Sequence, residues 1–274
     1  MIIDAHQHFI FPSRINYPWL EGEALEPLQR DFTPDDLRIE LEKNKVTQTI
    51  LVQTQHDLDE THEFLEIAAN TDYVAGVVGW VDLTDPHLET NLKTLLEAKH
   101  GQYLKGIRHQ IQEEPDPNWL LRDDVQRGVT ILESFGLIYE FVCSNREYTA
   151  CLETAKNHPN LQFVLDHAGK PNIKKSDFMA WQQSMMQFAA LENVVVKISG
   201  LTTQAIWHTW TKTDLQPYIK SLLEIFGSER CMYGSDYPVC LLAGGYGDLL
   251  EVIKHQSSQT EQENLVNKTA KKIY

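Results

Sequence analysis

At 274 residues, 42% of them hydrophobic, the chain is long enough to bury a large core. Its 24 Lys and Arg residues against 39 Asp and Glu residues give a net charge of −15 without a local basic cluster. Nucleic acid and anionic membrane surfaces are therefore not expected partners, because both need a basic patch. Four cysteines without a CxxC pair, and no apolar run of roughly 18 residues, indicate a soluble, cytoplasmic protein with reduced thiols. A homo-oligomer is compatible with this composition.

Eight short apolar runs, most of them rich in β-branched residues, recur along the chain. They begin at Met1 (MIID), Gln48 (QTILVQ), Val74 (VAGVVGWV), Leu104 (LKGIRHQ), Leu137 (LIYEFVC), Leu161 (LQFVLDH), Val194 (VVVKIS) and Cys231 (CMYGSD). Their nearly continuous apolar character is typical of parallel strands that helices cover on both faces. The runs therefore predict eight buried strands.

Amphipathic stretches of helical period lie between these runs, for example at 34–44, 123–135 and 216–227. The first follows Thr33 and Pro34, an N-cap and a first-turn proline, and the last ends on Gly227, a C-cap. Successive strands begin roughly 25 to 47 residues apart, and one strand with its crossover helix takes about 30. We therefore predict an α/β fold, a single (β/α)8 TIM barrel that forms one domain over residues 1–274.

Two other architectures are possible. Two smaller domains would fit the length, and an open doubly wound sheet would also alternate strands and helices. The open sheet is disfavoured because no predicted strand is followed by the classical glycine-rich phosphate turn. The segment 12–32, rich in proline and aromatic residues and without clear period, is predicted to be an active-site loop over the barrel mouth.

Polar side chains accumulate at the ends of the predicted strands, where such a barrel places its catalytic groups. They are His6 and His8, Gln53 and Gln55, Trp80 and Asp82, Arg108 and His109, Glu140, Asp166 and His167, Lys197 and Ser199, and Ser235 and Asp236. Taken alone, each has a structural explanation, such as an ion pair between Arg108 and Glu140 inside the rim. The joint placement of His167 and Asp236 with the two histidines of the first strand favours catalysis instead.

The histidine pair ends the first apolar run, in the segment DAHQHF. Because side chains alternate between the faces of a strand, His6 and His8 are expected to point the same way. Two neutral imidazoles on one face can clamp a divalent cation or polarise a substrate oxygen. A surface turn is the structural alternative for an isolated HxH.

Five segments together resemble the amidohydrolase superfamily: DAHQHF, KGIRHQIQEEPDPNWLLRDDVQRG, FVLDHAGKP, VKISGL and YGSDYPVCLLAGGYGD. More narrowly, they are similar to the amidohydrolase-2 branch of TIM-barrel lactonases. That branch includes sugar-acid lactonases for L-fuconate and L-rhamnonate, and hydrolases of 2-pyrone-4,6-dicarboxylate and sulfomuconolactone. The resemblance covers nearly the whole chain. It implies a hydrolase of carbohydrate metabolism that opens a small-molecule sugar-acid lactone by attack of activated water on the carbonyl.

The resemblance also implies roles for matching residues. Asp236 would be the general base that takes a proton from water. His6, His8 and His167 would hold one divalent metal, Zn or Mn, with Asp236 as a further ligand. In a metal-free site, the same imidazoles would polarise the lactone carbonyl together with a catalytic Arg108.

The chain departs from the pattern of the metal-rich amidohydrolases. Those proteins carry a bridging carboxylated lysine or a glutamate on strand four and a histidine on strand five. Here Arg108-His109-Gln110 and Glu140 stand at the corresponding strand ends. Without the bridging ligand, a binuclear centre is not expected.

Substrate hydroxyls need fixed donors and acceptors, and the candidates are His109, Gln53, Glu140, Trp80 and Trp119. A carboxylated lactone would instead need two or more converging arginines, since a guanidinium binds a carboxylate through two hydrogen bonds. Only Arg108 stands near a strand end, with Arg14 and Arg122 as further candidates from loops, which favours a neutral polyhydroxy lactone. The alternatives are a lactonase for a pyrone or muconate-type lactone, a decarboxylase of the same superfamily, and a catalytically silent barrel.

Overall fold

The computed structural model describes residues 1–175 and 177–274, and its eight strands form one parallel sheet in the order β1 to β8. The strands are β1 Ile3–Gln7, β2 Gln48–Val52, β3 Val74–Gly79, β4 Leu104–His109, β5 Ile138–Phe141, β6 Phe163–Leu165, β7 Val194–Ile198 and β8 Cys231–Tyr233. Just past the end of β8, Gln7 and Tyr237 form a parallel bridge that closes the ring. The predicted (β/α)8 barrel is confirmed.

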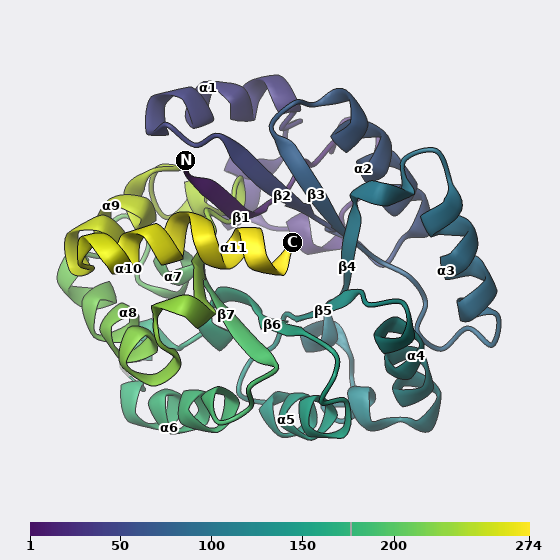
Figure 1. Ribbon diagram of the computed structural model, residues 1–274. Coiled ribbons are helices and arrows are strands. Elements are labelled where there is room, and N and C mark those ends of the chain that lie inside the picture. The colour runs from purple at the N-terminus through teal and green to yellow at the C-terminus, as the bar shows by residue number, and fades with distance from the viewer. Residues whose placement is uncertain (176) are drawn as a thin grey trace.

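Helices surround the ring of strands, as Figure 1 shows in a view along the barrel. They are α1 Pro34–Asn44, α2 Leu58–Asn70, α3 Leu88–Glu97, α4 Asp123–Ser134, α5 Tyr148–Asn157, α6 Phe178–Ala189, α7 Leu201–Gln204, α8 Lys212–Phe226, α9 Asp248–Gln256, α10 Gln259–Glu263 and α11 Thr269–Ile273. The last of them, α11, crosses one opening of the barrel, and the chain ends near its centre (Figure 1). No helix in the described part of the chain is both long and apolar enough to cross a membrane.

Local sequence signals account for the ends of the helices. Thr33 caps α1: its hydroxyl oxygen accepts from the backbone N–H of Asp36, while the Asp36 carboxylate accepts from the N–H of Thr33 at 2.9 Å. Helix α8 begins at Lys212, four residues before the predicted start, because Thr211 and Asp214 form a second capping box there. Gly227 follows its end with a φ of 76°, a left-handed value that favours glycine.

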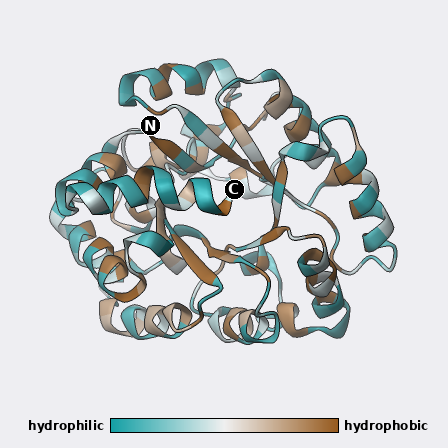
Figure 2. Ribbon diagram, in the orientation of Figure 1, coloured by the Kyte–Doolittle hydropathy of each residue, from teal (hydrophilic) through white to brown (hydrophobic). Residues whose placement is uncertain are grey.

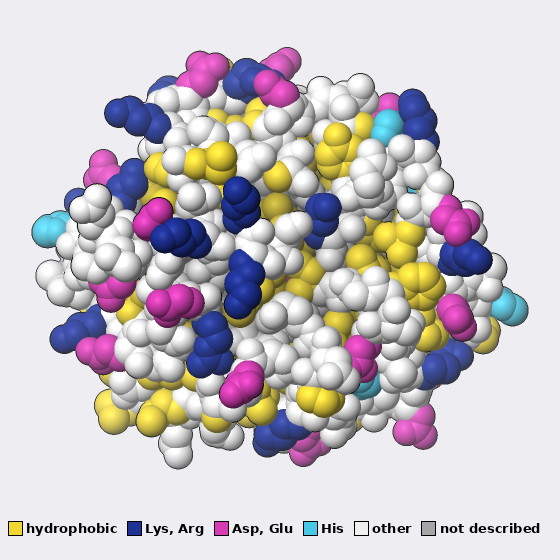
Figure 3. Space-filling model, in the orientation of Figure 1, with side chains coloured by type: hydrophobic (Ala, Val, Ile, Leu, Met, Phe, Trp, Pro, Cys, Tyr) yellow, Lys and Arg dark blue, Asp and Glu magenta, His cyan; other side chains and the backbone are white. Residues whose placement is uncertain are grey.

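The two ends of the barrel differ in polarity. Near the amino ends of the strands, the interior is an apolar layer of Ile3, Ala5, Ile138, Val164, Val195 and Met232, and Tyr274 packs against it. The strands are mostly brown in Figure 2, whereas the surrounding helices present teal outer faces. On the face that α11 crosses, acidic and basic side chains are interspersed (Figure 3). Because the interior layer near the amino ends is apolar, the polar groups of the barrel interior gather toward the carboxyl ends of the strands.

The predicted mouth loop forms two short 3-10 helices, η1 (Pro18–Leu20) and η2 (Glu23–Leu28). It is held to the barrel where the hydroxyl of Tyr17 accepts from the N–H of Phe11 at 3.0 Å, and where Ile10 forms an antiparallel bridge to Phe32. Trp19 of η1 lines the cavity at the carboxyl ends of the strands. The loop therefore contributes to the mouth, as predicted.

Candidate active site

A cavity of about 190 Å³ opens at the carboxyl ends of the strands. It is lined by His8, Trp19, Thr54, Arg108, Gln110, Gln112, Glu113, Val142, His167, Lys170, Thr203, Gln204, Asp236 and Val239. Four of the predicted site residues are among them: His8, Arg108, His167 and Asp236. The ends of β1, β4, β6 and β8 therefore bring histidine, arginine and carboxylate side chains to one cavity.

The histidines of β1 point to the same side, as their spacing predicts. Their Nε2 atoms lie 3.2 Å apart, and both side chains are buried. The Nδ1 atom of His8 is 2.7 Å from the carbonyl oxygen of Val52, which can only accept, so Nδ1 carries the proton and Nε2 offers its lone pair. Burial holds the pKa of His6 well below its usual value and also lowers that of His8. Both rings are therefore neutral at neutral pH.

Asp236 follows β8 with a φ of 61°, and its backbone N–H donates to the carbonyl of His6 at 2.8 Å. Its Oδ1 lies 3.6 Å from Nε2 of His8 and 3.9 Å from Nε2 of His6, and its Oδ2 lies 3.9 Å from Nδ1 of His167. Burial opposes ionisation, but the neighbouring histidines, His167 most of all, outweigh it and lower the pKa of Asp236. The carboxylate is therefore ionised among neutral imidazoles.

His167 lies just after β6 in the short helix η6 (Asp166–Gly169), with a left-handed φ of 53°. Its Nδ1 is 2.9 Å from Oγ of Ser199, and burial lowers its pKa to about 4. The ring packs against Gly200, where a Cβ atom would come within 2.8 Å of Nδ1. The small residue after Ser199 therefore makes room for this imidazole.

Arg108 pairs with Asp166, and the structural alternative of an ion pair with Glu140 is not formed. Its Nη1 donates to Asp166 Oδ2 at 3.0 Å, and its Nη2 donates to the carbonyl and side-chain oxygens of Gln53. Although Arg108 and Glu140 are register partners on β4 and β5, the glutamate is bonded to Lys197 at 2.6 Å. The Nε atom of Arg108 is buried and has no partner in the described part of the chain.

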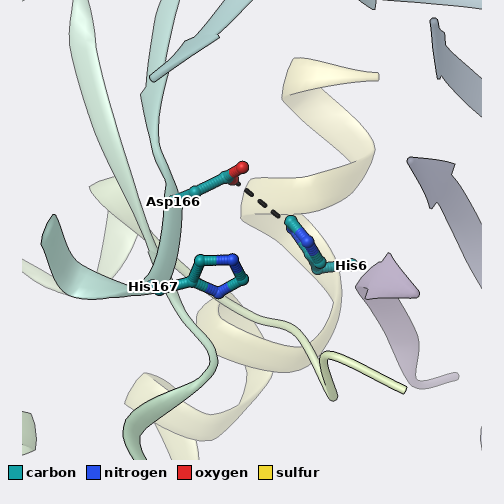
Figure 4. Close-up of side chains that lie close together, drawn as sticks. All are labelled: His6, Asp166 and His167. Atoms are coloured by element: carbon teal, nitrogen blue, oxygen red, sulfur yellow. Dashed lines mark ion pairs between the residues drawn. The ribbon is translucent and has the colours of Figure 1, made fainter. Parts of the chain in front are cut away.

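Lys197 forms the centre of a buried polar cluster beneath the cavity. Its Nζ lies 3.2 Å from Asp166 Oδ1 and 3.2 Å from His6 Nδ1, in addition to its bond with Glu140. Figure 4 shows His6 and Asp166 facing each other, with the 3.4 Å contact between them dashed and His167 alongside. In the sequence, this cluster is indicated by a single lysine within the otherwise apolar run VVVKIS. Glu140 is fully buried within it and does not line the cavity, which argues against its expected contact with substrate.

His109, Trp80 and Trp119 also lie behind the cavity wall. His109 Nδ1 accepts from the Trp80 indole at 3.0 Å, its Nε2 donates to Glu114 at 2.8 Å, and its ring stacks on Trp119 with the centroids 4.0 Å apart. None of the three lines the cavity, and neither does Gln53. The reason is alternation along β4: Arg108 points inward, so the next residue points away.

Several lining residues lie outside the sequence prediction. Lys170, within the segment FVLDHAGKP, donates from Nζ to the side-chain oxygen of Gln112, and burial lowers its pKa. Burial raises the pKa of Glu113, which lies at the cavity mouth. Trp19 comes from the predicted mouth loop, but no periodic signal marks which of that loop's residues faces inward.

The donors His6 Nε2, His8 Nε2 and Asp236 Oδ1 have the chemistry and spacing of a metal site. Two nitrogen ligands at the usual zinc distance lie roughly 3.3 Å apart in a tetrahedral site, close to the 3.2 Å between the two histidines. The expected fourth ligand, His167, belongs to a second group with His6 and Asp166. A third group, His56, His109 and Glu114, is unsuited because both ring nitrogens of His109 are hydrogen-bonded. The first group has the donor types for one divalent metal, which would replace the 3.2 Å contact between His6 Nε2 and Arg108 Nη1.

An eight-stranded barrel with buried histidines and an ionised aspartate at its carboxyl end is the architecture of a hydrolase-type site. Residues 3–274 match the family described as "Amidohydrolase", and the chain belongs to this family. The predicted membership is confirmed.

Curated relatives and a solved structure agree with this assignment. An L-fucono-1,5-lactonase from Burkholderia multivorans is 33% identical, with 99% of this chain and 95% of the relative covered. One from Burkholderia ambifaria is 35% identical over 90% of this chain and 83% of the relative. The crystal structure of a Burkholderia multivorans amidohydrolase with bound zinc superimposes with a TM-score of 0.94 and 34% identity, covering 100% of this chain and 99% of that one.

Proposed function

We propose that this protein is a cytoplasmic lactonase that hydrolyses a sugar-acid lactone of the L-fucono- or L-rhamnono-lactone type. The observation that carries the proposal is an ionised Asp236 carboxylate that lines a cavity at the carboxyl ends of the strands, beside neutral histidines and a buried arginine donor. The full-length similarity to curated L-fucono-1,5-lactonases supports the substrate class. The four free cysteines, all buried, support the cytoplasmic location.

Asp236 is the general base in this proposal. Its carboxylate removes a proton from a water molecule as the water oxygen attacks the lactone carbonyl carbon. When the tetrahedral intermediate collapses, the ring C–O bond breaks and the same proton passes from Asp236 to the departing ring oxygen. The product is the open hydroxy acid, and no other reactant is consumed.

The carbonyl oxygen gains negative charge as the carbon becomes tetrahedral, and it needs a fixed donor. Arg108 lines the cavity, and its buried Nε–H has no acceptor among the described residues. Its other nitrogens are anchored by Asp166 and Gln53, so the guanidinium is held in place before substrate binds. We therefore assign Arg108 to the oxyanion, with His167 closing the same side of the cavity.

Zinc or manganese would be held by His6, His8 and Asp236. When bound, such a metal polarises the carbonyl and lowers the pKa of water toward about 7. His8 is prepared for this role because its Nδ1–H is engaged by the carbonyl of Val52, which leaves Nε2 free.

The test is acid release, followed with a pH indicator, from L-fucono-, L-rhamnono- and D-galactono-lactones in the 1,4 and 1,5 forms. We expect turnover of at least one of them, and a loss of about 10²- to 10⁴-fold in Asp236→Asn. Asp35→Asn, at an exposed position of α1, is the matched control and should keep full activity. A chelator-treated sample with its metal content measured decides the metal. No turnover of any sugar lactone, or an active Asp236→Asn, would refute the proposal.

A further inference from the structure

Lys170 brings a positive charge to the cavity wall without an anionic partner among the described residues. Its Nζ donates to the side-chain oxygen of Gln112, a neutral amide, and both residues line the cavity. Arg108 and Lys197, by contrast, are each paired with the Asp166 carboxylate. An ammonium group has three N–H donors, so two of those on Lys170 remain for a ligand.

The ammonium group keeps its charge at neutral pH. Burial lowers the pKa of Lys170, but the Asp236 carboxylate raises it, and an unperturbed lysine titrates near about 10.4. Glu113 also lines the cavity, but its side chain is exposed, so water and salt screen its charge. The cavity therefore presents a cation that is able to bind an anion from outside the protein.

The backbone fixes the position of Lys170. It directly follows the helix η6 with a left-handed φ of 55°, and its N–H donates to the carbonyl of His167 at 2.8 Å. The same helix is anchored where the indole of Trp181 donates to the carbonyl of Ala168 at 2.7 Å. Residues other than glycine rarely adopt such a φ, and this kind of strain gathers at functional sites. The conformation therefore favours a functional role for the Lys170 side chain.

The proposed reaction itself creates an anion. The sugar lactone is uncharged, whereas its product is a hydroxy acid that releases one proton at neutral pH and carries a carboxylate. Negative charge appears first on the carbonyl oxygen of the tetrahedral intermediate and ends on that carboxylate. A cation in the cavity therefore stabilises the transition state and the product more than the substrate.

We propose that Lys170 binds the negative charge that ring opening creates, first together with Arg108 and then on the product carboxylate, and that the hydroxy acid therefore inhibits the enzyme. Gln112 is a positioning residue that holds the ammonium group at the cavity wall. This inference rests on the proposed lactonase function, and it adds to that function a charge-binding residue and inhibition by an anionic product.

The test compares two inhibitors of nearly the same shape: the hydroxy acid formed from the preferred lactone, and the primary amide of that acid. We expect the wild type to bind the acid about tenfold more tightly than the amide, the effect of one charged hydrogen bond. In Lys170→Met this preference should fall to about twofold or less. The kcat should fall about tenfold while the KM for the lactone stays nearly unchanged. A merely structural role would weaken both inhibitors alike.

Gln112→Glu is the second variant, and it decides the question if Lys170→Met does not fold. It keeps an acceptor for Lys170 but supplies an internal carboxylate, so the preference for the acid should fall about fivefold. Lys174→Met is the matched control, because Lys174 is exposed and does not line the cavity. It should keep the kcat and the preference of the wild type.

The two proposals fail in different ways. The role of Lys170 is overturned, and the lactonase function stands, if the wild type hydrolyses a sugar lactone but binds the acid no more tightly than the amide. The same holds if the preference for the acid persists in the two variants. If the wild type hydrolyses no sugar lactone, the lactonase function is wrong and the inference falls with it.

Discussion

The buried cluster around Lys197 makes a strong prediction for the stability of the barrel. Lys197, Glu140 and Asp166 are all fully buried, and the lysine contacts both carboxylates, at 2.6 and 3.2 Å. Lys197→Met removes the shared cation and leaves Glu140 as a buried acid without its charged partner. Burial already raises the pKa of Glu140 to about 7, and loss of the lysine raises it further.

Removing one partner of a buried ion pair costs about 3–5 kcal/mol. We therefore expect Lys197→Met to lose about 3–5 kcal/mol in the free energy of unfolding. With an m-value of about 3 kcal/mol/M, the urea midpoint moves down by roughly 1 to 1.7 M. Tryptophan fluorescence during urea unfolding measures this shift. Lys99→Met, at an exposed position, is the control and should stay within about 0.5 kcal/mol.

The double variant Lys197→Met/Glu140→Gln separates charge from packing. The amide keeps an acceptor for the hydroxyl of Tyr274, which bonds to Glu140, but removes the ionisable acid. We expect the double variant to be more stable than Lys197→Met by about 1–2 kcal/mol, because Glu140→Gln removes the buried carboxyl that the missing lysine no longer compensates. A single variant that loses less than about 1 kcal/mol, or a double variant that loses the sum of both single changes, would refute this reasoning.

Two further predictions concern Gly200 and Glu60. Gly200→Ala should lower the unfolding free energy by about 2 kcal/mol and reduce turnover, because the backbone has a φ of 63° there and the new Cβ would collide with His167. Gly136 has a similar φ but no neighbouring atom where a Cβ would lie, so Gly136→Ala should show the backbone effect alone. Thermal unfolding and activity assays measure both variants. Burial raises the pKa of Glu60 to about 7, so its protonated form stabilises the fold below about pH 4.5, and this contribution is lost as pH rises through 7. Urea unfolding between pH 5 and 8 should therefore show the free energy of unfolding of the wild type falling relative to that of Glu60→Gln as the pH rises. Two parallel curves of unfolding free energy against pH would contradict this.

The sequence allowed the barrel to be predicted in some detail because its strands are buried on both faces. Continuous apolar runs locate the strands, and capping residues such as Thr33 locate helix starts. The direction of the His6 and His8 side chains followed from alternation, and their 3.2 Å approach bears it out.

The site was predicted less completely, for two physical reasons. Alternation along β4 turns Arg108 inward and places His109 behind the wall, and a list of polar strand-end residues does not separate the two. Glu140 is fully buried and bound by Lys197, so it does not reach the cavity. Loop residues such as Trp19 and Gln112 reach the cavity through tertiary packing, for which a single sequence carries no periodic signal.

The contact between Tyr274 and Glu140 joins the two ends of the barrel. Tyr274 enters from the end that α11 crosses, and its hydroxyl bonds to the carboxylate that holds Lys197, which in turn contacts His6. Local opening of α11 would therefore admit water to the interior beneath His6 while the strands stay paired. In a hydrogen-exchange experiment, the protection of the α11 amides should then indicate how well ordered the cavity residues are, although the cavity lies at the opposite end of the barrel.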